Sequence, residues 1–205
     1  MKKRELILKN MKWIAVFICL VLVIGIVEDV LEKDVYYLDV IGYDFISNHL
    51  ISDSLTPIVK MITQFGGTII LITLAMILLI IIKNKKTGAL ICGNLAISAG
   101  LNQILKNIVQ RPRPTEFRII DESGYSFPSG HSMVSAAFYG FLIYLIYKNI
   151  KNKYLKGSLI SILSILIVLI GISRIYLGVH YTSDVIAGFL IAILYLIIFV
   201  TSTGV

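Results

Sequence analysis

Long apolar segments alternate with short polar ones along the whole chain of 205 residues. Six of the apolar segments approach the length of roughly 20 residues that a helix needs to cross a bilayer. They are continuously apolar instead of alternating, which favours helices over barrel strands, and a helix satisfies its own backbone hydrogen bonds inside lipid. The pattern predicts an all-α, polytopic membrane protein with six transmembrane helices in a single domain over residues 1–205. The expected spans are Met11–Val27, Gly66–Ile82, Gly88–Leu105, Met133–Tyr147, Leu159–Ile172 and Val185–Val200.

The segment between the first two spans has a different pattern. Val35, Leu38, Ile41 and Phe45 recur at helical spacing among aspartates and tyrosines. This spacing predicts a short amphipathic helix over residues 35–51 that lies along the membrane surface. His49 belongs to this segment, where an interfacial side chain is the preferred interpretation.

The third span is rich in small and amide side chains, which allow neighbouring helices to approach closely and to share hydrogen bonds. This composition predicts that the third span is the central helix of the bundle. The residues concerned are Gly93, Asn94, Ala96, Ser98, Gly100, Asn102 and Gln103.

Composition and charge support a membrane protein and argue against nucleic-acid binding. With 57% hydrophobic and 15% charged residues, the chain has more apolar surface than one water-soluble domain can bury. Its net charge of +7 could indicate nucleic acid as a partner. Most of the basic residues, however, cluster between the apolar segments, where lipid head groups are nearer. We therefore expect a bilayer and no nucleic acid.

The distribution of lysine predicts the orientation of the chain. Lysine-rich segments precede the first span, separate the second from the third, and separate the fourth from the fifth. Because such segments stay on the cytoplasmic side, both termini are expected in the cytoplasm of a multi-pass protein of the cell membrane. The basic residues concerned are Lys2, Lys3, Arg4, Lys9, Lys12, Lys83, Lys85, Lys86, Lys148, Lys151, Lys153 and Lys156.

Four arginines fall on the opposite, extracytoplasmic side: Arg111, Arg113, Arg118 and Arg174. Arginine presents a planar fork of donors that matches phosphate oxygens, so this placement indicates recognition of an anion. For Arg111 and Arg118 an alternative is that the side chains reach lipid phosphates at the helix ends.

Two short blocks on this side carry groups suited to phosphate. Lys106 ends the third span, and Arg113 follows in a loop stiffened by Pro112 and Pro114. The second block is Pro128-Ser129-Gly130-His131, which opens the fourth span. Its free backbone N–H groups attract phosphate, and its glycine lets an oxygen approach the backbone. Taken alone, the serine could also be a plain helix cap.

A third block combines a cation with a histidine and a carboxylate. Ser173-Arg174 ends the fifth span, and His180 and Asp184 stand at the start of the sixth. A spacing of four places both side chains on one helix face, where the carboxylate can take the proton of one ring nitrogen and leave the other as a nucleophile. Without the other blocks, an ordinary surface pair would be the simpler interpretation.

Together the three blocks resemble the signature of the type 2 phosphatidic acid phosphatase superfamily. That signature is Lys, six residues, Arg-Pro; then Pro-Ser-Gly-His; then Ser-Arg, five residues, His, three residues, Asp, and every position matches. The resemblance implies a metal-independent lipid phosphatase in which His180 attacks phosphorus and forms a phosphohistidine. It implies that Asp184 orients His180, while His131 protonates the leaving oxygen and then activates water. It also implies that Lys106, Arg113, Ser129, Gly130 and Arg174 hold the phosphoryl oxygens.

The expected chemistry requires no cofactor and no metal, because three cations and a helix N-terminus balance the phosphate charge. Glu116, Asp121 and Glu122 could in principle bind a cation, but a solvated loop is the preferred interpretation. Candidate substrates are undecaprenyl diphosphate, phosphatidylglycerophosphate and phosphatidate, and the motifs do not distinguish among them. The main alternative is a lipid-phosphate transporter or binding protein without turnover; a vanadate-dependent haloperoxidase shares the signature, but six spans argue against it. The oligomeric state stays open.

Overall fold

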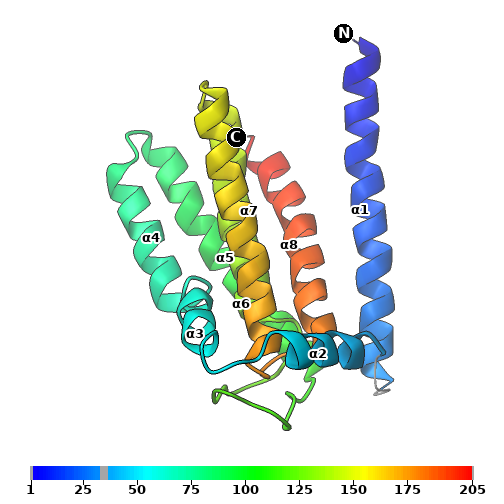
Figure 1. The fold of residues 1–205 in the computed structure, drawn as a ribbon. Helices are drawn as coiled ribbons and strands as arrows, with labels where there is room; N and C mark the ends of the chain where they lie inside the picture. The colour runs from blue at the N-terminus through cyan, green and yellow to red at the C-terminus, as the bar shows by residue number, and fades with distance from the viewer. Residues whose placement is uncertain (1, 33–36, 205) are drawn as a thin grey trace.

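The structure is a computed structural model that describes residues 2–32 and 37–204, and in these ranges the chain forms eight helices and no strand. The predicted all-α class is confirmed. Figure 1 shows a bundle of long helices with two short ones lying across one end. The helices are α1 (Lys2–Leu31), α2 (Tyr37–His49), α3 (Thr56–Gln64), α4 (Thr68–Ile81), α5 (Lys85–Val109), α6 (Gly130–Asn149), α7 (Lys153–Tyr176) and α8 (Thr182–Thr203).

Five of these helices are long and apolar enough to cross a membrane, namely α1 from Trp13 onward, α5, α6, α7 and α8. A sixth span requires α3 and α4 together, because α4 alone has 14 residues. The two helices are bent by 45° at a short break that contains Gly66 and Gly67. The second predicted span, which began at Gly66, is therefore the longer half of a broken span, and α3 was not expected.

Helix α2 confirms the short helix expected from the sequence. It runs across the lower end of the bundle in Figure 1, roughly perpendicular to the spans. Ile41 and Phe45 are exposed along it, as suits a side that faces lipid, whereas Asp39 and Ile46 are buried against the protein. Val35, part of the predicted pattern, lies outside the described residues.

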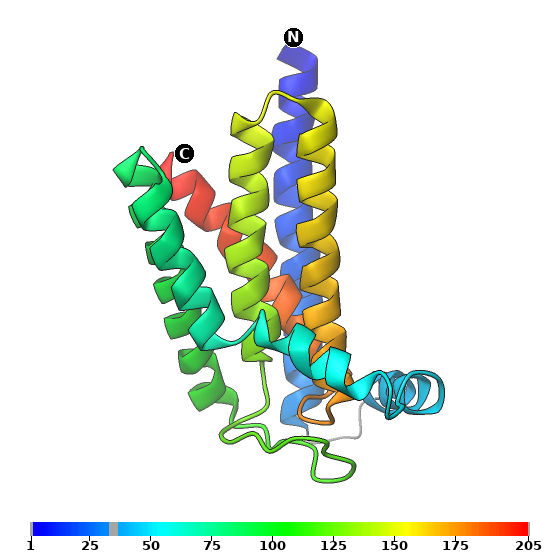
Figure 2. The same ribbon diagram turned by 60° about the vertical axis from the view of Figure 1, so that its left-hand side comes forward.

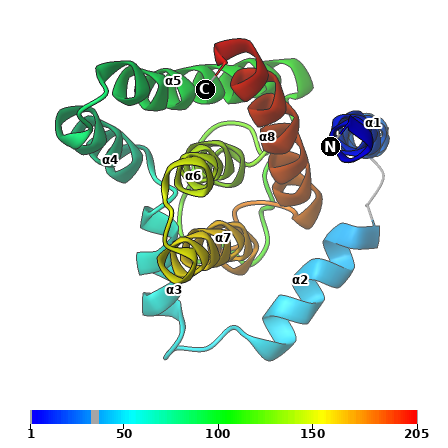
Figure 3. The same ribbon diagram turned by 90° about the horizontal axis from the view of Figure 1, so that it is seen from above.

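The central helix is α6, so the prediction that the third span occupies the centre is wrong. Figure 3 shows α6 enclosed by α5, α7 and α8. Small side chains of α6, among them Ser135, Ala136 and Ala137, are buried and allow this close packing. In α5, by contrast, a Cβ added to Gly93 or Gly100 would meet nothing within 4 Å, so part of its small-residue pattern faces open space.

The two ends of the bundle carry different parts of the sequence. In Figures 1 and 2 the start of α1, the α4–α5 and α6–α7 connections and the end of α8 lie at the upper end. These are the lysine-rich segments, apart from the end of α8. The loop between α5 and α6 and the turn between α7 and α8 lie at the lower end, together with α2. All three motif blocks therefore meet at one end.

Close packing of α7 on α8 can be tested at Gly171. A Cβ there would lie 2.9 Å from Cγ1 of Val185 and closer still to the ring of Phe189. Gly171→Leu should therefore separate the two helices and destabilise the protein by about 1–3 kcal/mol, measured as a lower thermal unfolding temperature in detergent. Gly157→Leu, on the same helix but with nothing within 4 Å, should have little effect. Equal losses in the two variants would contradict this packing.

Candidate active site

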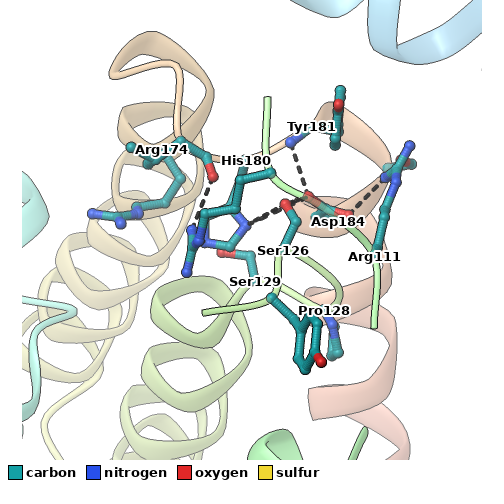
Figure 4. Close-up of polar contacts among 12 residues, drawn as sticks. Arg111, Ser126, Pro128, Ser129, Arg174, His180, Tyr181 and Asp184 are labelled. Carbon is teal, nitrogen blue, oxygen red and sulfur yellow. Dashed lines mark hydrogen bonds and ion pairs between the residues drawn. The ribbon is translucent and has the colours of Figure 1, made fainter. Parts of the chain in front are cut away.

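The carboxylate of Asp184 is fully buried at the start of α8 and gathers donors from several segments. Its Oδ2 accepts hydrogen bonds from the backbone N–H of Tyr181 at 2.9 Å and from the hydroxyl of Ser126. Its Oδ1 accepts a hydrogen bond from Nη1 of Arg111 at 2.7 Å. Figure 4 shows Asp184 between His180 and Arg111, with these contacts drawn as dashed lines. A carboxylate with so many donors is strongly held in its ionised form.

The ring of His180 lies between Asp184 and Arg113. Its Nδ1 is 3.4 Å from Oδ2 of Asp184, and its Nε2 is 3.0 Å from Nη1 of Arg113. A guanidinium group only donates hydrogen bonds, so Nε2 must be the acceptor. A neutral ring therefore carries its proton on Nδ1, toward the carboxylate, and presents a lone pair at Nε2. The spacing of four between His180 and Asp184 does bring the two side chains together, as predicted.

Burial keeps this imidazole neutral. The His180 side chain is almost completely buried, which lowers its pKa from 6.5 to about 4. Asp184 opposes this shift by its hydrogen bond and its charge, whereas the cations Arg113 and Arg174 add to it. The ring is therefore in its nucleophilic form at neutral pH.

Lys106 and Arg113 pin the loop between α5 and α6 over the site. Lys106 Nζ donates to the carbonyl oxygens of Tyr125 and Ser126, at 2.5 and 3.2 Å. Arg113 donates to the carbonyl oxygens of Ser123, Gly124 and Val179 at 2.9–3.0 Å. Both cations are thus preorganised by carbonyl oxygens, which are uncharged and can give way to a more strongly accepting anion.

The second block opens α6 in the predicted way. Ser129 is the N-cap, and its hydroxyl accepts hydrogen bonds from the backbone N–H and the hydroxyl of Ser132, at 3.4 and 2.9 Å. Ser129 is completely buried, whereas Gly130 and His131 line a cavity. An added Cβ on Gly130 would lie 3.0 Å from Oδ1 of Asn102, so a side chain here would require the Asn102 amide to shift by a few tenths of an ångström. The capping role that the sequence left open for Ser129 is therefore present.

Arg174 has partners that the sequence did not indicate. Its guanidinium is 1% exposed and donates to Glu122 at 2.5 Å and to the hydroxyl of Thr63 at 2.8 Å. Burial disfavours the charged form of Glu122, but the charge of Arg174 and its hydrogen bond outweigh this effect and hold the pKa of that carboxyl below its usual value. The interpretation of Glu122 as a member of a solvated loop is wrong, because the loop folds back and carries it to the fifth span.

Arg111 was expected to recognise an anion or to reach lipid phosphates at the helix end, whereas the structure pairs it with two carboxylates of the protein. Its Nη2 pairs with Asp39 of α2 at 2.7 Å, and its Nη1 contacts Asp184 and the hydroxyl of Ser183. The guanidinium also stacks on the Tyr181 ring, 4.0 Å from the ring centroid. The sequence offered one clue, since Asp39, Gly42 and Ile46 share a face of the predicted surface helix.

A cavity of about 750 Å³ joins these groups to the apolar interior. Its polar end is lined by Lys106, Arg113, Gly130, His131 and His180, and also by Glu122. Its other end runs between α4, α5 and α6 and is lined by Leu71, Ile72, Ala75, Met76, Leu95, Ala96, Ala99 and Val134. The arrangement therefore has room for a molecule with an anionic head and an apolar tail.

The structure brings most, but not all, of the predicted site residues to this cavity. The other three do not line it: Asp184 lies behind His180, Ser129 caps α6, and Arg174 is paired with Glu122 of the cavity wall. Within the described ranges, no group of three or more His, Cys, Asp or Glu side chains is arranged to hold a metal ion. The cavity is lined by two histidines, His131 and His180, and two cations, Lys106 and Arg113.

Comparison with known proteins identifies a matching protein family and named relatives. The family model of the PAP2 superfamily matches residues 87–204, which is more than half of the chain and includes all three blocks. Phosphatidylglycerophosphatase B from Bacillus subtilis is 36% identical over 95 residues. That match covers 46% of this chain and 47% of the relative, so it spans about half of each protein. An undecaprenyl-diphosphatase from Sulfolobus acidocaldarius is 26% identical over 159 residues, covering 74% of this chain and 73% of the relative.

Solved structures agree with the fold. The transmembrane PAP2 type phosphatidylglycerolphosphate phosphatase from Bacillus subtilis superposes with a TM-score of 0.76 at 27% identity, covering 94% of this chain and 96% of that one. Aquifex aeolicus LpxE gives a TM-score of 0.68 at 24% identity, covering 82% and 97%, and at that identity it supports the fold alone.

The low pKa of His180 predicts a pH dependence of stability. Between about pH 6.5 and 4 the unfolded chain binds a proton at this histidine and the folded protein does not, so stability is lost as the pH falls. From pH 7 to 5 the contribution is about 2 kcal/mol. His180→Gln should therefore flatten the decrease of unfolding temperature in detergent over this range. His49→Gln, at an exposed position, should retain the wild-type decrease, and an unchanged decrease in His180→Gln would contradict the prediction.

Proposed function

The chain belongs to the PAP2 superfamily, and we propose that it is an integral membrane phosphatase that releases phosphate from a lipid phosphate or diphosphate. One observation carries the proposal. His131 and His180 line the same cavity as Lys106 and Arg113, and Nε2 of His180 bears an accepting lone pair. A site that only bound lipid phosphate would need the cations but not a neutral imidazole oriented by a buried carboxylate.

The proposed reaction has two steps. In the first, Nε2 of His180 forms a bond to phosphorus while the bond from phosphorus to the lipid oxygen breaks, and His131 gives its proton to that oxygen. Asp184 accepts the Nδ1–H of His180 and stabilises the positive charge that develops on the ring. In the second step His131 takes a proton from water, whose oxygen bonds to phosphorus as the phosphorus–nitrogen bond breaks. Phosphate leaves and both histidines return to their starting states.

The phosphoryl oxygens would be held by Lys106, Arg113 and Arg174, together with the backbone N–H groups around Gly130 and with Ser129. Lys106 and Arg113 would exchange carbonyl acceptors for charged oxygens, which accept more strongly. Arg174 has a buried Nε–H that lacks an acceptor within the described ranges, and a phosphoryl oxygen could supply one. Its Nη2 contacts Glu122, so the phosphate would compete with that carboxylate, and its Nη1 donates to the hydroxyl of Thr63.

The apolar end of the cavity suits a lipid tail that stays in the bilayer while the head reaches the histidines. We infer lateral entry from the membrane between α4 and α5, whose side chains line that end. The lysine-rich connections lie at the opposite end of the bundle, and such segments remain in the cytoplasm. The site would therefore face the extracytoplasmic side, with both termini in the cytoplasm.

Two relatives are named for phosphatidylglycerophosphate and undecaprenyl diphosphate, and these lipids, with phosphatidate, are the proposed substrates. The test is phosphate release from a panel of these lipids by the purified chain in detergent. We expect hydrolysis of at least one lipid, with an unchanged rate when a chelator removes divalent cations. Activity that disappears with the chelator would contradict the metal-independent mechanism.

The nucleophile can be tested with a matched pair of histidine variants. His180→Ala should lower phosphate release by at least about a thousandfold, because it removes the group that bonds to phosphorus. His49→Ala, at the exposed histidine of α2, should retain the wild-type rate. Both variants should bind the lipid phosphate in a sedimentation assay with vesicles. Undiminished hydrolysis by His180→Ala would refute the assigned nucleophile.

A further inference from the structure

A buried ion-pair chain connects the surface helix α2 to the catalytic carboxylate. Asp39 of α2 contacts Nη2 of Arg111 at 2.7 Å, and Nη1 of the same guanidinium contacts Asp184 at 2.7 Å. The side chains of Asp39, Arg111 and Asp184 are 6%, 11% and 0% exposed. Low exposure makes such contacts strong and leaves little solvent to replace a missing partner.

Ser183, which precedes Asp184 in the sequence, holds the Asp39 end of this series of contacts. Its backbone N–H donates to Oδ1 of Asp39 at 2.7 Å, and its hydroxyl donates to Oδ2 at 2.9 Å. Helix α2 also packs closely on the start of α8. A Cβ added to Gly42 would lie 2.9 Å from Cβ of Thr182 and closer still to its hydroxyl. The position of Asp39 is therefore fixed by packing as well as by charge.

The charges of Asp39, Arg111 and Asp184 explain why two carboxylates share one arginine. Arg111 alone would cancel the charge of Asp184 and weaken its effect on His180. With Asp39 present, the three side chains carry a net charge of about −1. Asp184 can then be fixed by Arg111 and still stabilise the positive charge that develops on His180. Removal of Asp39 should thus affect catalysis although its carboxylate makes no contact with His180.

We propose that Arg111 and Asp39 are positioning residues for Asp184, and that α2 is thereby a working part of the active site. This inference rests on the proposed function, because it is in the proposed reaction that Asp184 must stabilise the positive charge on His180. It adds to that function a role for residues outside the three motif blocks, one of them 145 positions before Asp184 in the chain (184 − 39).

The first test compares kcat and KM for the most active lipid phosphate, with the full chain in detergent. Asp39→Asn and Arg111→Gln should each lower kcat on the order of tenfold to a hundredfold, with KM changed less than about threefold. Asp44→Asn on the same helix and Lys60→Gln on α3 are exposed controls that each remove one charge, and they should retain the wild-type kcat. Gly42→Ala changes no charge but displaces α2, and it should lower kcat in the same way as Asp39→Asn.

The pH profile separates positioning from general loss of structure. The charged and titratable groups around His180 are Asp184 of α8, Arg174 of α7, His131 of α6, Lys106 of α5, and Arg113 and Glu122 of the loop. Arg111→Gln leaves the charge of Asp184 uncompensated, so the acid limb of kcat/KM should move to higher pH. Asp39→Asn lets Arg111 cancel the charge of Asp184, so its acid limb should move to lower pH. Loss of structure alone would not move the acid limbs of the two variants in opposite directions.

A measurement without turnover distinguishes failure of this inference from failure of the proposed function. With ¹⁵N-labelled histidine, the His180 resonances, assigned through His131→Gln and His49→Gln, report the Nδ1–H tautomer. We expect both Asp39→Asn and Arg111→Gln to shift these resonances, and the controls to leave them unchanged. Unchanged resonances and kcat in both variants would overturn the inference. A wild-type chain that hydrolyses none of the lipids, with resonances that still respond, would instead overturn the proposed function alone.

Discussion

The hydrogen bonding of one buried carboxylate, Asp184, constrains the whole lower end of the bundle. It ties the α5–α6 loop through Ser126, the turn before α8 through Tyr181, and α2 through Arg111. Its backbone oxygen also accepts from the N–H of Ser129, so the N-terminus of α6 is held to the same residue. A buried charge is costly unless it is paired, and each partner that satisfies this one also places a part of the cavity. The contacts that stabilise this end of the bundle are therefore the same contacts that set the geometry of the site.

The membrane architecture could be predicted because hydropathy depends only on neighbouring residues. Each predicted span overlaps a helix, and apart from α4, which is shorter than its predicted span, the helices are longer than the apolar segments. The added residues include Lys106, His131, Arg174 and Asp184, polar groups at helix ends that hydropathy excludes from a span. Local rules also gave the cap at Ser129 and the pair of His180 and Asp184, since each depends on positions three or four apart.

Contacts between distant segments could not be derived in this way. Arg111 meets Asp39 and Asp184 across separations of 72 and 73 residues, and Arg174 meets Glu122 across 52. The sequence around a carboxylate in a polar loop is the same whether the side chain is solvated or paired with a distant arginine. The prediction of the central helix was wrong for a related reason. Both α5 and α6 contain small residues, and only the packing of the whole bundle decides which of them is enclosed.

The central claim is that Asp184 orients His180 so that Nε2, which accepts a hydrogen bond from Arg113, carries the lone pair that bonds to phosphorus. The most direct measurement is a rapid alkaline quench of the wild-type chain during turnover of a ³²P-labelled lipid phosphate, followed by mass spectrometry of its peptides. A histidine phosphoramidate survives base and is lost in acid, and we expect it on the peptide that contains His180. Label on His131, or no covalent label together with inversion of configuration at phosphorus, would contradict the account.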